Sequence, residues 1–223
     1  MQIIAHIHTD FPTKFGVPRQ SGLAESLRGT IVFTPPYRNP DALRGIEGFS
    51  HIWLIWQFHK ALRDGFSPTV LPPKLGGKMR VGVFATRSPF RPNAIGLSSV
   101  RLLGVALHAP DGPLLHVAGA DLVDGTPIFD IKPYLPYADC HTDATDAFAD
   151  IRRDTPLRVV FPDEWLQMIP EDKREALFEV LALDTRPGYQ NDPTRRYGFN
   201  YAGFDVRFTI DGDTLTVVEI VKL

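Results

Sequence analysis

The run HIWLIWQFH (residues 51–59) is apolar and aromatic, and its nine residues have the length of a buried β-strand. Short runs rich in apolar and β-branched residues lie on both sides of it, separated by glycine and proline. They are QIIAHIH (2–8), GTIVFT (29–34), RVGVFAT (80–86), SSVRLLGVAL (98–107) and LLHVAGADLV (114–123). Many short strands without long alternating helices predict a barrel or a sandwich, and they argue against a doubly wound parallel sheet.

The pattern changes in the last third of the chain. EDKREALFEVLALD (171–184) predicts a helix with acidic residues in its first turn and apolar residues on one face. FDVRFTI (204–210), the turn DGD and TLTVVEIVKL (214–223) predict a closing hairpin. We therefore expect a mainly β protein, with a β-rich domain at residues 1–147 and a small α+β domain at residues 148–223.

The composition is that of an ordinary globular protein, with 43% hydrophobic and 22% charged residues and a formal net charge of −2. No apolar run approaches the roughly 20 residues that a membrane-spanning helix needs. The amino terminus also lacks the basic start and apolar stretch of a signal peptide. Cys140 is the single cysteine, which excludes an internal disulfide and a cysteine-based zinc cluster. We expect a cytoplasmic protein with no membrane association.

Charge is unevenly distributed along the chain. No Asp or Glu occurs from residue 65 to residue 110, whereas eight aspartates lie between Asp121 and Asp154. The basic residues of the acid-free stretch are Lys74, Lys78, Arg80, Arg87, Arg91 and Arg101. A locally basic zone is typical of proteins that bind a phosphate-bearing partner such as RNA. The alternative is that the two zones lie side by side in the fold and neutralise each other.

Within that zone, GVFATRSPFRPNAIGLSSV (82–100) predicts a rigid loop that follows a short strand at Val81–Ala85. Pro92 disfavours a helical conformation at Arg91, so a helix does not bring Arg87 and Arg91 onto one face. Arginines in a stiff loop suit an anion or a planar polar group, because the guanidinium offers several donors in one plane. The alternative is a surface turn whose charges are only solvated.

Other polar groups follow the same pattern, standing in proline- or glycine-containing turns or at the ends of expected strands. They are Arg19 and Gln20 beside Pro18, the pair His59 and Lys60, the pair Asp121 and Asp124, and the late group Asp184, Arg186 and Tyr189. The chain has no glycine-rich Rossmann motif and no Walker loop, and no Ser-His-Asp order stands out. His6 and His8 lack a third ligand at suitable spacing, so we predict no metal site.

Five segments together resemble the TsaA-like family, and in particular its bacterial TrmO-type members, the tRNA (adenine-N6)-methyltransferases. They are FGVPRQSGL (15–23), LRGIEGFSHIWLIWQFH (43–59), GVFATRSPFRPNAIGLSSVRL (82–102), DLVDGTPIFDIKPYLPYAD (121–139) and ALDTRPGY (182–189). The resemblance implies a β-barrel methyltransferase domain without a Rossmann core, which uses S-adenosylmethionine and forms a homodimer. It also implies a substrate: the anticodon loop of tRNA that carries N6-threonylcarbamoyladenosine at position 37.

The resemblance also implies roles for individual residues. For the cofactor it points to Pro18, Arg19, Gln20, His59, Lys60, Arg87, Leu97 and the run Asp121, Leu122, Val123 and Asp124. The general base is left open among Asp124, His59 and Asp184. For binding the tRNA substrate, the candidates are Arg91, Asn93, Asp184, Arg186 and Tyr189. We expect Arg19 or Arg87 to bind the cofactor carboxylate, and Arg91 or Arg186 the threonyl carboxylate. The rival readings are a non-catalytic RNA-binding β-barrel and a nucleotide-binding hydrolase.

Overall fold

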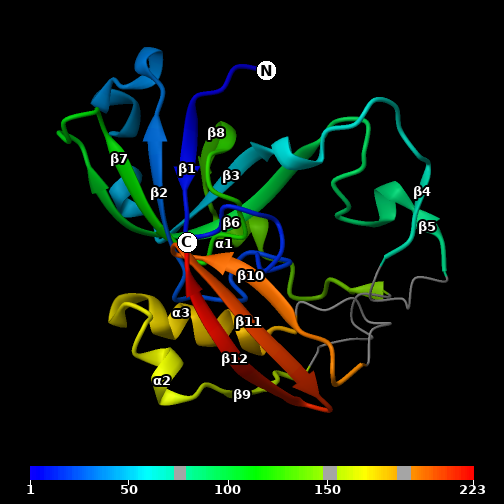
Figure 1. Ribbon diagram of the computed structural model, residues 1–223. Helices are drawn as coiled ribbons and strands as arrows, with labels where there is room; N and C mark the ends of the chain where they lie inside the picture. Colours follow the sequence, from blue (N-terminus) through cyan, green and yellow to red (C-terminus); the bar gives the residue numbers. More distant parts are fainter. Residues whose placement is uncertain (73–78, 148–154, 185–191) are drawn as a thin grey trace.

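The computed structural model describes residues 1–72, 79–147, 155–184 and 192–223. Six strands close into an antiparallel barrel in the order β1-β2-β7-β6-β3-β8 (Figure 1). Their bounds are β1 Ala5–His8, β2 Arg28–Phe33, β3 His51–Gln57, β6 Ile95–Ala106, β7 Leu114–Ala118 and β8 Thr126–Pro133. Closure leaves the barrel without an open edge, because each strand pairs with a neighbour on both sides. The prediction of a mainly β barrel fold is confirmed.

Alternation along the strands builds the barrel core. In β3, Ile52, Leu54 and Trp56 are buried, while the residues between them are half-buried. This period of two is what a pleated strand imposes, since successive side chains point to opposite faces. The matching inward residues of the other strands include Ile7, Ile31, Val100, Leu115, Val117 and Ile128. Ile52, Leu54 and Trp56 of the run 51–59 therefore contribute to the barrel core.

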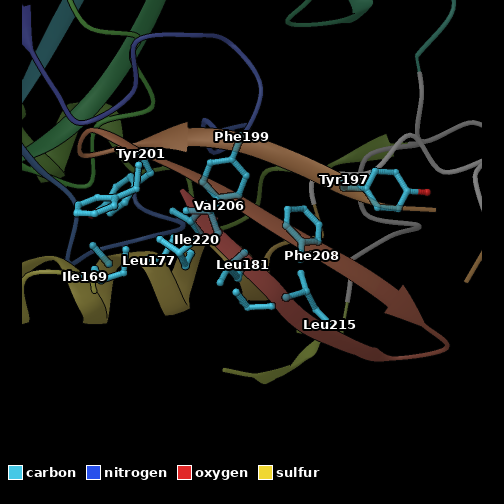
Figure 2. Packing of buried hydrophobic residues seen from close by; sticks show 14 of the residues in the cluster. Ile169, Leu177, Leu181, Tyr197, Phe199, Tyr201, Val206, Phe208, Leu215 and Ile220 are labelled. Carbon is cyan, nitrogen blue, oxygen red and sulfur yellow. The ribbon is translucent and has the colours of Figure 1, made fainter. Parts of the chain in front are cut away.

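The carboxy-terminal part is a four-stranded sheet covered by a helix. The sheet has the order β10-β11-β12-β9, with β9 Arg158–Val160, β10 Tyr197–Tyr201, β11 Phe204–Asp211 and β12 Thr214–Lys222. Helix α3 (Glu171–Ala182) buries Leu177 and Leu181 against the sheet, among aromatic residues such as Phe208 (Figure 2). The short helix α2 (Asp163–Leu166) completes this region, whereas the other short helix, α1 (Pro136–Asp139), follows β8 and is bound to the barrel through the hydrogen bond from Trp53 Nε1 to Asp139 at 2.9 Å. The predicted helix and hairpin are confirmed.

Residues 9–27 tie the barrel to the carboxy-terminal domain. Phe11, Ala24 and Leu27 belong to the same buried cluster as Leu177, although they lie at the amino-terminal end of the chain. The ring centroid of Phe11 lies 5.2 Å from that of Tyr201. Polar contacts join the same two parts: Lys173 Nζ to Asp10 at 2.7 Å, and Ser26 Oγ to Glu179 at 2.8 Å. The segment is therefore held from both sides.

Several local predictions were wrong. The strand expected at Val81–Ala85 is only β5 (Val81–Gly82) followed by a 3-10 turn, and it pairs with β4 (Thr69–Val70) outside the barrel. Figure 1 shows β4 and β5 on an arm away from the barrel. β6 already begins at Ile95, inside the stretch expected to be loop, and β7 ends before Gly119. A strand of only a few residues shows too few alternating apolar and polar positions for the sequence to predict where it begins and ends.

Among the described residues, no helix is both long and apolar enough to cross a membrane. The same residues contain no cluster of three or more histidine, cysteine or acidic side chains able to hold a metal ion.

Candidate functional site

A cavity of about 510 Å³ opens between the barrel and the loops that contain residues 14–21 and 86–91. Its volume lies in the range of small-molecule sites. Ten of the predicted residues line it: Pro18, Arg19, Gln20, His59, Lys60, Arg87, Arg91, Leu97, Asp121 and Val123. These residues come from four distant segments, so the fold brings together what the sequence showed only as separate motifs.

Arg87 and Gln20 link two walls of the cavity. The guanidinium Nη1 of Arg87 donates a hydrogen bond to the side-chain oxygen of Gln20. This places the two rigid loops, 67 residues apart in sequence, in direct contact. Arg19 stands beside them and donates from Nη2 to the backbone carbonyl of Asp184 at 3.5 Å. Arg19 and Arg87 therefore bring two guanidiniums to the cavity on loops stiffened by proline, and Lys14, Lys60 and Arg91 also line it.

A chain of hydrogen bonds from the barrel core ends at Asp121. Trp56 Nε1 donates to Ser98 Oγ at 2.9 Å, and Ser98 Oγ donates to the Asp121 carboxylate at 2.6 Å. The Trp56 ring fits because residue 96, opposite it on β6, is glycine: a Cβ there would lie 2.3 Å from the ring. Burial raises the pKa of Asp121, while the hydrogen bond from Ser98 and the nearby charge of Arg87 act in the opposite direction.

His59 and Lys60 lie on a 3-10 turn (His59–Ala61) that comes directly after β3. Lys14 Nζ donates to the carbonyl of Lys60 at 2.9 Å, which ties the turn to the loop that carries Arg19. Burial and the neighbouring charge of Lys60 lower the pKa of His59 below its ordinary value of 6.5. The imidazole is therefore mainly neutral at pH 7, and a neutral ring can accept a proton.

Asp124 and Leu122 are not among the residues that line the cavity. The Asp124 carboxylate accepts a hydrogen bond from the backbone N–H of Thr9 at 3.0 Å, and it lies 3.2 Å from Nδ1 of His8. The side chain of Leu122 is buried in the barrel core, and its carbonyl accepts a hydrogen bond from the Thr9 hydroxyl. Of the two aspartates three residues apart, the structure directs only Asp121 into the cavity.

The residues predicted for the substrate side are dispersed. Arg91 uses Nη1 to bind the carbonyls of Thr86 and Ser88 at 3.0 and 3.2 Å, so part of this guanidinium holds its own loop. Asn93 lines a second cavity of about 610 Å³, which shares Arg91 with the first. Asp184 has a positive φ of 43° and lies next to the cavity through its contact with Arg19. Arg186 and Tyr189 lie outside the described residues.

Comparison with known proteins identifies the family. Residues 6–140 match the family model described as the tRNA-methyltransferase O N-terminal domain, and residues 154–223 match the TrmO C-terminal domain. The chain belongs to the tRNA-methyltransferase O family. This membership confirms the predicted resemblance and the predicted class of enzyme, a tRNA methyltransferase.

Similar proteins extend over nearly the whole chain. A tRNA (adenine(37)-N6)-methyltransferase of Escherichia coli is 43% identical and aligns over 93% of this chain and 91% of its own length. A Pseudomonas aeruginosa protein named as an S-adenosylmethionine-dependent methyltransferase is 42% identical over 92% of this chain and 90% of its own. A crystal structure of TrmO from P. aeruginosa superposes with a TM-score of 0.77 at 36% identity, covering 98% of this chain and 97% of that one.

The sequence reading missed the aromatic and hydroxyl groups of the cavity in this tRNA-methyltransferase O family member. Trp53, Trp56, Phe58 and Ser99 line it, and Ser98 connects Trp56 to Asp121. The aromatic run 51–59 contains the signal, but the sequence analysis predicts a buried strand there and names only His59 of this run as a site residue. Trp56 serves both purposes, because it is 6% exposed and still contributes to the cavity wall.

Proposed function

We propose that this protein transfers the methyl group of S-adenosylmethionine to N6 of threonylcarbamoyladenosine at position 37 of tRNA, next to the anticodon. The observation that carries the proposal is the 510 Å³ cavity, in which Arg87, Gln20 and Asp121 face an aromatic wall. The transfer breaks the methyl–sulfur bond and forms a methyl–N6 bond; S-adenosylhomocysteine leaves with the bonding electrons, and the N6 proton passes to a base.

The cavity offers groups that fit each part of the donor. Arg19 and Arg87 supply guanidinium donors for its carboxylate, because charge-assisted hydrogen bonds to a carboxylate are among the stronger polar contacts. Asp121 offers acceptor oxygens for an amino group or for ribose hydroxyls. Trp56 and Phe58 line the same cavity, and an aromatic face favours a cation such as a sulfonium. The remaining residues proposed for this site are Pro18, Gln20, His59, Lys60, Leu97 and Val123, whereas Leu122 and Asp124 do not line the cavity.

Alignment of nitrogen, methyl and sulfur supplies much of the rate of such a displacement. The nitrogen is attached to a carbonyl and loses its proton during attack, so a general base assists. Among the three residues considered for this role, we propose His59, which lines the cavity and has a lowered pKa. Asp184 is the second choice, because its segment contacts Arg19. Asp124 ranks last, since its carboxylate is bound to Thr9.

We propose that the anticodon loop of tRNA approaches from the side of Arg91, Asn93 and Asp184, together with Arg186 and Tyr189. Aromatic side chains and arginines commonly bind unstacked bases of single-stranded RNA loops. A homodimer and a cytoplasmic location belong to the same proposal. Sedimentation velocity tests the dimer: a single species of monomer mass over the working concentration range contradicts it.

The function is tested by incubating the protein with labelled S-adenosylmethionine and tRNA from a strain that lacks the corresponding gene. Digestion and chromatography then identify the labelled nucleoside. We expect N6-methyl-N6-threonylcarbamoyladenosine, and we expect no product with tRNA from cells unable to add the threonylcarbamoyl group. An unlabelled tRNA fraction, despite a folded protein that binds the donor, refutes the proposal. Arg87→Ala, which is expected to bind the donor more weakly, serves as a control with reduced methylation at low donor concentration.

A further inference from the structure

The second cavity shares a wall with the first. Gln57, Pro89, Arg91 and Ile95 line both, so a ligand in one cavity lies next to a ligand in the other. A methyl transfer needs donor and acceptor side by side, with the reacting atoms in contact. At about 610 Å³, the second cavity has the size of a small-molecule site. If the donor occupies the first cavity, the second is placed to hold the acceptor.

Arg63 gives the second cavity a positioned cation. Its guanidinium carbon lies 3.8 Å from the centroid of the Phe90 ring, and both residues line the cavity. Stacking on a ring uses the flat face of a guanidinium and leaves the in-plane N–H donors available for a carboxylate. Within the described part of the chain, no acceptor takes a hydrogen bond from Arg63. Arg91, by comparison, already donates from Nη1 to two carbonyls.

The charges of the lining favour an anionic ligand. The side chains of Arg63 and Arg91 are positive, and that of Asp64 is negative. A threonylcarbamoyl group carries one carboxylate, whereas an unmodified adenine carries no charge. A carboxylate therefore gains more from this lining than a neutral base does, because a hydrogen bond between two ionised groups is stronger than a neutral one.

Aromatic groups stand at the edge of the same cavity. Phe66 lines it, and its ring stacks with that of Phe84 at 6.2 Å between centroids and 24° between planes. The two rings are 51% and 74% exposed, which is unusual for residues of this size. They flank the short β4–β5 sheet on the arm shown in Figure 1. Exposed rings of this kind are typical platforms for bases of single-stranded RNA.

We infer that the second cavity is the acceptor subsite, in which Arg63 binds the threonyl carboxylate of the target base and Phe66 with Phe84 stacks a neighbouring base. The inference rests on the proposed function. It assigns Arg63, Phe66 and Phe84, none of which stood out in the sequence, and it gives the carboxylate contact to Arg63 in place of Arg91 or Arg186. It would also give the enzyme a physical basis for preferring the modified adenosine over a plain one.

The test compares three anticodon stem-loop RNAs with threonylcarbamoyladenosine, its threonyl methyl ester, or adenosine at position 37. The wild-type protein is expected to favour the acid over the ester by about ten- to a hundredfold in kcat/KM, the effect of a charge-assisted contact. Arg63→Ala is expected to bring this ratio close to one, and Arg63→Lys to restore part of it. S-adenosylmethionine binding by calorimetry stays normal, because Arg63 does not line the first cavity.

Arg80→Ala is the matched control. Arg80 lies on the same arm, donates to Thr69 and does not line the second cavity, so its loss should leave the acid-to-ester ratio unchanged. Phe66→Ala and Phe84→Ala should raise KM for all three RNAs and keep the ratio. If Arg63→Ala keeps the wild-type ratio, the subsite is wrong although the proposed function stands. If the wild-type protein methylates none of the RNAs and no tRNA, the proposed function itself fails, and the inference with it.

Discussion

Gly16→Ala is expected to destabilise the protein and to weaken cofactor binding together. Gly16 has a φ of 93°, a conformation that costs a residue with a side chain about 1–2 kcal/mol. In addition, a Cβ at this position would lie 2.5 Å from Cδ2 of Phe199, and relieving such overpacking costs about 1–3 kcal/mol. The sum of about 2–5 kcal/mol is a large fraction of the roughly 5–15 kcal/mol that stabilises a typical domain. Because Pro18, Arg19 and Gln20 follow directly, the cofactor affinity should fall as well.

Gly22→Ala provides the matched control. Gly22 lies in the same segment with a φ of 78°, but a Cβ there meets no atom within 4 Å. Its replacement should therefore show only the backbone cost of about 1–2 kcal/mol. Urea unfolding measures both free energies, and calorimetry with S-adenosylmethionine measures the affinities. In the double variant with Phe199→Ala, the ring is absent and the penalty of Ala at position 16 should shrink by about 1 kcal/mol or more.

The reasoning is refuted if Gly16→Ala and Gly22→Ala cost the same free energy and bind the cofactor equally well. That result would mean that the loop moves away from Phe199 without disturbing Arg19 and Gln20. It would also mean that the carboxy-terminal domain does not fix the position of residues 14–21, the loop proposed to bind the cofactor.

Three further outcomes are expected. Arg87→Ala should lower S-adenosylmethionine affinity about ten- to a hundredfold in calorimetry, because one charge-assisted hydrogen bond is lost. The same variant should bind tRNA nearly normally in a filter assay. Arg186→Ala should instead keep its cofactor affinity and lose methyl transfer to tRNA. Burial raises the pKa of Asp121 above 3.8, so the folded state binds the carboxyl proton more tightly than the unfolded state does. The contribution of Asp121 to the free energy of unfolding should therefore fall as the pH rises above 3.8. Asp121→Asn should remove that part of the pH dependence, as measured by urea unfolding. The affinity for tRNA should fall linearly with salt on a logarithmic plot, and a flat plot would argue against phosphate contacts by the basic zone.

The sequence predicted most of the barrel because strands with one buried face leave a period-two pattern. β2, β3 and β6 show this alternation clearly, and the ends of each strand agree with the expected bounds to within about three residues. β9 and β10 were missed, because three to five residues between turns carry little pattern. Tyr197–Tyr201 is a strand only through its pairing with β11, a contact that no local signal reveals.

The site was predictable where rigid loops display polar groups, and not where the backbone decides the direction of a side chain. Asp121 and Asp124 looked equivalent in the sequence. In the structure they lie between Gly119 and Gly125, which have φ values of 72° and 73°. The turns at these glycines direct Asp121 towards Ser98 and Asp124 towards Thr9. Residue spacing cannot distinguish the two orientations, because it contains no information about φ.

The position of residues 9–27, which carry the proposed cofactor ligands Arg19 and Gln20, was equally hidden in the sequence, and it affects how variants of the carboxy-terminal domain should be interpreted. Phe11 at one end and Leu27 at the other are buried in the carboxy-terminal core, and the loop between them carries Arg19 and Gln20. Isolated apolar residues in a loop have no periodicity, so the sequence assigned the segment to the barrel alone. Because the core holds both ends, a substitution that loosens it is also expected to displace Arg19 and Gln20, which we propose bind the cofactor. Loss of methylation in such a variant therefore does not locate a tRNA contact unless cofactor affinity has been measured in the same protein.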